Sequence, residues 1–139
     1  MKISYKIVGG TPPAWVTLFD NATGDASPVF KPSFRNVNQL SQGFGAGSQA
    51  VNPLANAICS LNLPFSKTYT SNAVALLAIR TLRSNLSGVK VHLSVIEGSE
   101  TQYYPNGSLE NMDANLTGCS VDFNMTFQTE DVTGTMPST

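Results

Sequence analysis

The sequence predicts an α+β fold that is mainly β: an antiparallel β-sandwich or a partly closed barrel with one flanking α-helix. Several short segments alternate apolar and polar residues, the period of a strand with one buried face, and only one segment has a helical period. The chain also has 12 Asn, 15 Ser and 13 Thr among its 139 residues. These residue types favour turns, caps and β surfaces over long helices, which supports a sheet with a single helix.

The first third of the chain predicts two alternating strands, an edge strand and a long loop. Residues 2–8 and 14–19 alternate, and the Gly and Pro residues between them predict a connection that allows the two to pair. Residues 29–34 predict a short strand that Pro32 confines to a sheet edge or a bulge, because proline donates no ladder hydrogen bond. Residues 36–56 show neither period and are interrupted by glycines, so we expect a mobile loop there.

The middle of the chain predicts a strand followed by the helix. Residues 58–65 alternate, with Cys59 and every second residue after it apolar. From Ser71 to Ser87, apolar residues recur at helical spacing, Thr70 or Ser71 caps the start, and Gly88 follows as a stop signal. One helix of about four turns is therefore expected.

The last third predicts strands at 89–95, 100–104, 108–113 and 119–128, separated by turns at 97–99, 105–107 and 117–118. Residues 129–139 form a polar tail that we expect to fray. The chain length suits a single domain over residues 1–139. The strongest alternating runs provide the predicted core: Val91, Leu93, Val95, Val121, Phe123, Met125 and Phe127.

Composition and charge restrict the class of function. Eight basic and nine acidic residues give a net charge of -1, so the chain lacks the positive field of a dedicated nucleic-acid binder. Charged residues make up 12% of the chain, about half the usual share. A surface of uncharged polar groups is easier to desolvate and favours an assembly subunit over a freely diffusing enzyme. No apolar run is long enough to predict a membrane span, and we expect no membrane partner.

The sequence predicts no catalytic, cofactor-binding or metal-binding residue, and we expect no enzyme activity. The single His92 falls on the polar side of its strand, where we expect an imidazole at the surface or at an interface. No Gly-x-Ser-x-Gly nucleophile motif occurs, and one His with two Cys is a poor ligand set for zinc. Cys59 and Cys119 are expected as reduced, buried thiols.

The glycine-rich part of the predicted loop provides the candidate subunit contacts. Phe44 lies between glycines, and a large apolar side chain on a mobile loop serves as an anchor in a complex. Ordering several glycines costs conformational entropy that only a partner surface can offset. The predicted contact residues are Gly43, Phe44, Gly45, Gly47 and Asn52.

The order of elements in the last two thirds of the chain resembles the tail-tube-like family of bacteriophage tail structural proteins. The resemblance is carried by Asn52-Pro53, Cys59-Ser60-Leu61, the helix 73–86, the strand 89–95, Glu100-Thr101-Gln102-Tyr103-Tyr104-Pro105-Asn106-Gly107-Ser108-Leu109 and Leu116-Thr117-Gly118-Cys119-Ser120-Val121-Asp122-Phe123. It implies a tail-tube-like fold, with two packed antiparallel sheets and one helix at the flank.

The resemblance also implies a function and its partners. Copies of the chain would assemble into a ring, hexameric by the resemblance, that forms or caps the tail tube and contacts other tail proteins. DNA would pass through it without specific binding, and the protein would be made in the host cytoplasm and located in the virion tail. The alternative is a capsid-decorating or carbohydrate-binding β-sandwich module, which exposed aromatic rings on a sheet face would favour. Tyr103 and Tyr104 are adjacent, so one of the two points outward in a regular strand.

Overall fold

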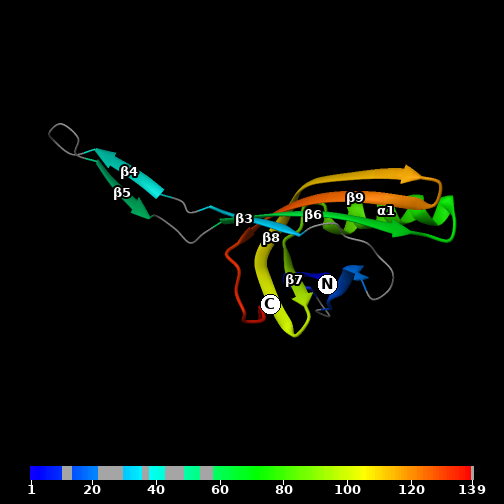
Figure 1. Ribbon diagram of the computed structural model, residues 1–139, viewed down its shortest axis with the longest axis horizontal. Helices are drawn as coiled ribbons and strands as arrows, with labels where there is room; N and C mark the ends of the chain where they lie inside the picture. The colour runs from blue at the N-terminus through cyan, green and yellow to red at the C-terminus, as the bar shows by residue number, and fades with distance from the viewer. Residues whose placement is uncertain (11–13, 22–29, 36–37, 43–48, 54–57, 139) are drawn as a thin grey trace.

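The computed structural model describes the whole chain except residues 11–13, 22–29, 36–37, 43–48, 54–57 and 139 (Figure 1). Nine strands and one helix make up the described part. In chain order they are β1 Lys2–Ile7, β2 Val16–Asp20, β3 Lys31–Arg35, β4 Asn38–Gln42, β5 Gln49–Pro53, β6 Ile58–Thr68, α1 Asn72–Leu86, β7 Val91–Glu97, β8 Glu100–Thr117 and β9 Ser120–Glu130.

Seven of the strands form one antiparallel sheet in the order β2-β1-β7-β8-β9-β6-β3, and β4 pairs with β5 separately. The prediction of a mainly β chain with one helix is confirmed. The sheet is open, with β2 and β3 as its edge strands, so the described residues do not form the partly closed barrel that was one expected alternative. The expected edge position of the strand that contains Pro32 is confirmed, since β3 pairs only with β6 in this sheet.

β8 is a single long strand that joins the two halves of the sheet. Its first part pairs with β7 and its second part with β9, and the pairing shifts register opposite Val91–Leu93. The predicted turn at residues 105–107 is therefore wrong. Asn106 takes a positive φ of 52° at this point, a conformation that Asn tolerates, so the strand bends without reversing (Figure 1).

The bend brings the two ends of the sheet toward each other around a common core. The rings of Phe19 on β2 and Phe65 on β6 lie 5.9 Å apart, and Phe65 stacks on Phe123 of β9 at 5.0 Å. The Lys67 ammonium donates a hydrogen bond of 3.2 Å to the backbone carbonyl of Leu18, which links the two ends without a strand ladder. All seven residues predicted for the core are buried: Val91, Leu93, Val95, Val121, Phe123, Met125 and Phe127.

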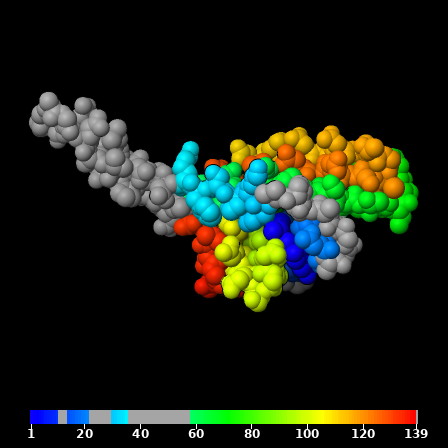
Figure 2. Space-filling model, viewed as in Figure 1, coloured from blue at the N-terminus to red at the C-terminus, as the bar shows by residue number. Residues whose placement is uncertain are grey.

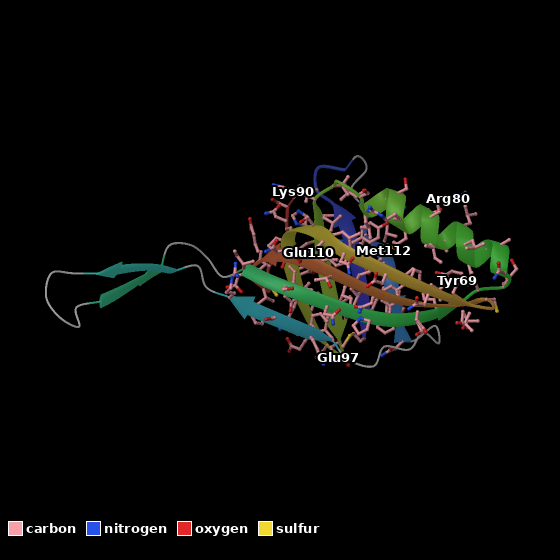
Figure 3. The ribbon with its side chains drawn as sticks, turned by 90° about the horizontal axis from the view of Figure 1, so that it is seen from above. Tyr69, Arg80, Lys90, Glu97, Glu110 and Met112 are labelled. Carbon is pink, nitrogen blue, oxygen red and sulfur yellow. The ribbon has the colours of Figure 1, made fainter. Side chains whose placement is uncertain are left out.

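The helix begins and ends close to the predicted positions. The Ser71 hydroxyl accepts a hydrogen bond of 3.2 Å from the Val74 N–H, which identifies Ser71 as the N-cap. Gly88, with a φ of 72°, follows the last turn. Ala75 and Leu86 are buried against the sheet, and the helix runs along β8 (Figure 3).

The segment predicted as a loop over residues 36–56 contains a hairpin instead. β4 and β5 pair in antiparallel register from Asn38 opposite Pro53 to Gln42 opposite Gln49, and the hairpin projects away from the seven-stranded sheet (Figure 1). The prediction failed because the hydrogen bonds of a hairpin are between backbone groups. Such bonds impose no alternation of side-chain types on the sequence.

The C-terminal tail is bound to the sheet at Thr133 and Pro137, so the expectation that the chain frays directly after Thr129 is wrong. β9 continues to Glu130, and Thr133 then exchanges two backbone hydrogen bonds of 2.8 and 2.9 Å with Tyr103 on β8. The Lys6 ammonium donates a further bond of 3.2 Å to the carbonyl of Pro137. In Figure 2 the tail, in red, lies against the residues of β8.

Candidate functional site

The outer face of β6, β9 and the second part of β8 is a continuous polar surface, which we call the polar face. Five consecutive outward positions of each strand lie in register on it, and none of these fifteen residues is buried; the next outward pair, Ile58 of β6 and Glu130 of β9, lies at its end. The fifteen residues are Ser60, Asn62, Pro64, Ser66 and Thr68 on β6; Ser120, Asp122, Asn124, Thr126 and Gln128 on β9; and Ser108, Asn111, Asp113, Asn115 and Thr117 on β8.

This face forms because β6 and β9 alternate strictly and the second part of β8 alternates on either side of an irregularity at Glu110. Every second residue enters the core, as Phe65 and Phe123 do, so the residues between them must point outward. The side chains on the polar face bond to one another across the strands. The Ser66 hydroxyl donates to an Asp122 carboxylate oxygen at 2.5 Å, and the hydroxyls of Thr68 and Ser120 lie 3.0 Å apart.

The charges of the polar face are few and mostly negative. Among the fifteen residues named above, only Asp113 and Asp122 are charged. Two basic residues lie beside the face on the edge strand, where Lys31 stands opposite Asn62 and Arg35 opposite Ile58. The middle of the surface is therefore hydrophilic without any positive charge to hold a polyanion.

The predicted subunit contacts do not lie on this surface. Gly43, Phe44, Gly45 and Gly47 fall outside the described residues. Asn52 lies on β5, opposite Gln39 of β4 in the projecting hairpin.

His92 is buried, with 2% of its surface exposed, so the expectation of an imidazole at the surface or at an interface is wrong for this chain. Its Nδ1 atom accepts a hydrogen bond of 3.2 Å from the backbone N–H of Asn106, at the bend of β8. Burial lowers the pKa of His92, the positive charge of Lys6 lowers it further, and Glu130 opposes both effects. The imidazole is the acceptor for a backbone group that the bend removes from the strand ladder.

Two other buried groups have shifted pKa values for the same reason. Burial raises the pKa of the Cys59 thiol, and it raises the pKa of Tyr104 to about 12. Both groups are therefore neutral at pH 7. Cys59 is buried as predicted, whereas Cys119 is only half-buried, and the two thiols are not joined.

No group of three or more His, Cys, Asp or Glu side chains lies together among the described residues. α1, the helix of the described part, is too short and too polar to cross a bilayer.

The exposed apolar side chains of α1 were not predicted from the sequence. Val74, Leu76 and Leu77 are large apolar residues, and each is at least 43% exposed. The signal was present in the sequence, because these three positions lie outside the apolar face formed by Ala75 and Leu86.

The comparisons with known proteins add no family. The chain matches no protein-family model, and a search of curated proteins finds no relative.

Proposed function

We propose that this protein is a structural subunit of a bacteriophage tail. Copies of it assemble into a ring, hexameric by the resemblance described above, that forms or caps the tail tube. The two packed sheets of a tail-tube-like fold correspond in this proposal to the two parts of the bent sheet, one on each side of the core. The protein is made in the host cytoplasm, contacts other tail proteins and is located in the virion tail.

The observation that carries this proposal is the polar face. A conduit for DNA needs a wall that is wetted and that does not bind phosphate groups, because each neutralised phosphate adds to affinity. The fifteen residues of the polar face meet both needs, since thirteen are uncharged and the other two are acidic, and two exposed residues at the end of this face, Glu110 of β8 and Glu130 of β9, are acidic as well. In the proposed ring this face lines the channel.

The projecting hairpin supports assembly. β4 and β5 extend away from the sheet, which gives a subunit a means to reach a neighbour (Figure 1). The contact residues predicted from the sequence, including Phe44 and Asn52, belong to this segment or to the residues between its strands.

The alternative of a carbohydrate-binding or capsid-decorating module has less support. One ring of the pair Tyr103 and Tyr104 was expected to point outward; Tyr104 is buried, and Tyr103 is half-buried and packs against Trp15 at 6.0 Å. Its backbone is also bonded to the C-terminal tail through Thr133. The ring is therefore part of a covered layer and not an open stacking platform.

The test is assembly of the purified protein, measured by light scattering and negative-stain electron microscopy. We expect rings with a central hole at high protein concentration. Phe44→Ala should leave the circular dichroism spectrum unchanged while weakening assembly. A protein that stays monomeric at every concentration would contradict the proposal.

A second variant tests the position of the polar face. Asn124→Lys adds a positive charge to the middle of that face and should assemble as the parent does, since a channel wall makes no subunit contact. Ser84→Lys, at an exposed position of α1, is the matched control for an added surface lysine. Loss of rings in Asn124→Lys alone would show that the face is a subunit contact and not the channel wall.

A further inference from the structure

The end of the C-terminal tail, residues 133–138, lies at a sheet edge that β9 leaves open (Figure 2). Tyr103, in the first part of β8, pairs with Ser94 of β7 on one side. β9 pairs with β8 only from Ser108 onward, so the other side of Tyr103 is available. Thr133 fills it by exchanging two backbone hydrogen bonds of 2.8 and 2.9 Å with Tyr103. The tail therefore occupies a place where an extended chain adds to the sheet.

A buried cation completes this place. Lys6 of β1 is 6% exposed, and its ammonium donates a hydrogen bond of 3.2 Å to the Pro137 carbonyl. A buried ammonium needs such an acceptor. We call Tyr103 and Lys6 the docking surface. Both residues bond to backbone groups of the tail, so the docking surface recognises an extended chain with a carbonyl at the position of Pro137.

The end of the tail is held by few contacts. The pairing of Thr133 with Tyr103 is an isolated bridge, and none of residues 133–138 is buried. Val132, just before them, packs against the core and marks where the anchored part of the chain ends. A segment held by a few hydrogen bonds and by no buried apolar side chain detaches locally while the rest of the fold stays intact.

Met136 lies between the two docked residues, Thr133 and Pro137, and is 56% exposed. It is a large apolar side chain that its own copy leaves in water. A second copy beside the docking surface would cover it, so this side chain favours a contact between copies.

We propose that copies of this chain exchange the ends of their C-terminal tails. Residues 133–138 of one copy leave their own β8 and occupy the docking surface of a second copy, where Thr133 pairs with Tyr103 and Pro137 accepts from Lys6. The bonds are the same in both arrangements, so the local concentration of neighbouring docking surfaces decides which arrangement forms. The proposal does not require the ring proposed above, because two copies are enough for the exchange.

The experiment places one cysteine in each of two full chains that also carry Cys119→Ser, since the Cys59 thiol is buried. Thr133 and Tyr103 form a hydrogen-bonded pair, in which the Cα atoms lie about 5.5 Å apart. A disulfide spans that distance. Tyr103→Cys and Thr133→Cys chains are purified separately, mixed at concentrations up to millimolar and oxidised with copper phenanthroline. Non-reducing gels detect covalent dimers, and mass spectrometry identifies the joined peptides.

We expect a mixed dimer joined between positions 103 and 133, because only a tail docked on another copy brings these two cysteines together. Ser99 is exposed in the turn before β8, and Ser99→Cys in place of Tyr103→Cys is the control for random collision. The mixed dimer should form at least about tenfold faster than this control, since docking raises the effective concentration of the two thiols.

A second pair of variants repeats the test without replacing the Tyr103 ring. Gln102→Cys and Gly134→Cys lie next to the bridge, and both positions are exposed. Melting temperatures show that each variant is folded. A single chain with both Tyr103→Cys and Thr133→Cys should form an intrachain disulfide when dilute and interchain dimers as its concentration rises.

Two results would overturn the proposal. One is mixed dimers that form no faster than in the Ser99→Cys control with both pairs of variants. The other is a double-cysteine chain that forms only the intrachain disulfide at every concentration. Ring assembly is scored separately by electron microscopy. Rings without the mixed dimer would contradict this proposal alone, and mixed dimers without rings would contradict the proposed function alone.

Discussion

Lys6 of β1 and His92 of β7 stand directly opposite each other in the antiparallel pairing of these strands, and both side chains are buried. The Lys6 ammonium donates a hydrogen bond to the Pro137 carbonyl and lies 5.2 Å from the centroid of the Trp15 ring. The imidazole is bonded to Asn106 on its other side. A protonated His92 would place a second positive charge in this layer and remove the acceptor of the Asn106 N–H.

This relationship predicts a loss of stability as the pH falls below neutrality. The pKa of His92 is lowered in the folded chain by burial and by Lys6, from its ordinary value of 6.5. The unfolded chain therefore takes up the proton first, and acid favours unfolding by at most about 1.4 kcal/mol per pH unit from this group. The contribution of neutral His92 to stability is complete above pH 6.5, and it is lost as the pH falls from 6.5 to the lowered pKa of the folded chain.

The measurement is the melting temperature between pH 5 and 8 for the parent, His92→Gln and Lys6→Met. His92→Gln should be less stable at pH 7.5 and should lose less stability than the parent between pH 7 and 5. Lys6→Met should also flatten the profile, because removing the like charge brings the pKa of His92 closer to 6.5. Identical slopes for all three proteins would rule out this role for His92.

The alternation of β9 predicts opposite outcomes for two neighbouring residues. Phe123 is 2% exposed and stacks on Phe65, so Phe123→Ala should lower the free energy of unfolding by about 3–5 kcal/mol. Asp122 is exposed on the polar face, and Asp122→Asn should change the free energy of unfolding by no more than about 0.5 kcal/mol. Urea unfolding followed by circular dichroism measures both, and a larger cost for Asp122→Asn would mean that the strand faces are reversed.

The start of α1 allows a test of the N-cap, for which the sequence offered two candidates. Ser71→Ala removes the acceptor of the Val74 N–H and should cost about 1 kcal/mol of stability. Thr70, one residue earlier and exposed, is the control, and Thr70→Ala should cost about 0.5 kcal/mol or less. Thermal melts of the two variants would contradict the assignment if Thr70→Ala were the more damaging.

Gly107 is required for a close approach of strands at the bend of β8. A methyl group at this position would lie 2.7 Å from Thr129 Cγ2 and 3.3 Å from the Val91 carbonyl oxygen. Because Thr129 is itself buried, Gly107→Ala should destabilise the fold by about 1–3 kcal/mol.

Gly134 in the C-terminal tail is the matched control for that substitution. A methyl group there meets nothing within 4 Å, so Gly134→Ala should change stability by about 0.5 kcal/mol or less. Chemical denaturation of both variants decides the point, and equal stabilities would show that the bend accommodates a side chain at position 107.

What the sequence determined by itself was the local structure wherever one face of an element is buried. The core of β9, the buried side of β6 and the extent of α1 follow from side-chain periods, because burial on one face imposes a period of two residues on a strand and 3.6 on a helix. The polar face follows in the same way, since its residues are those left between the core positions.

Only the tertiary structure decided the features that depend on contacts between distant segments. The pairing of β4 with β5 depends on backbone hydrogen bonds, and the bend at Asn106 depends on its positive φ and on the bond of its N–H to the His92 imidazole. Neither feature produces a side-chain period in the sequence. The burial of His92 and the contact between Phe19 of β2 and Phe65 of β6 arise when segments far apart in the chain meet in space. The sequence of a single strand or helix shows which of its own faces is apolar. It does not show which other segment will cover a polar face, or whether an apolar face will stay exposed.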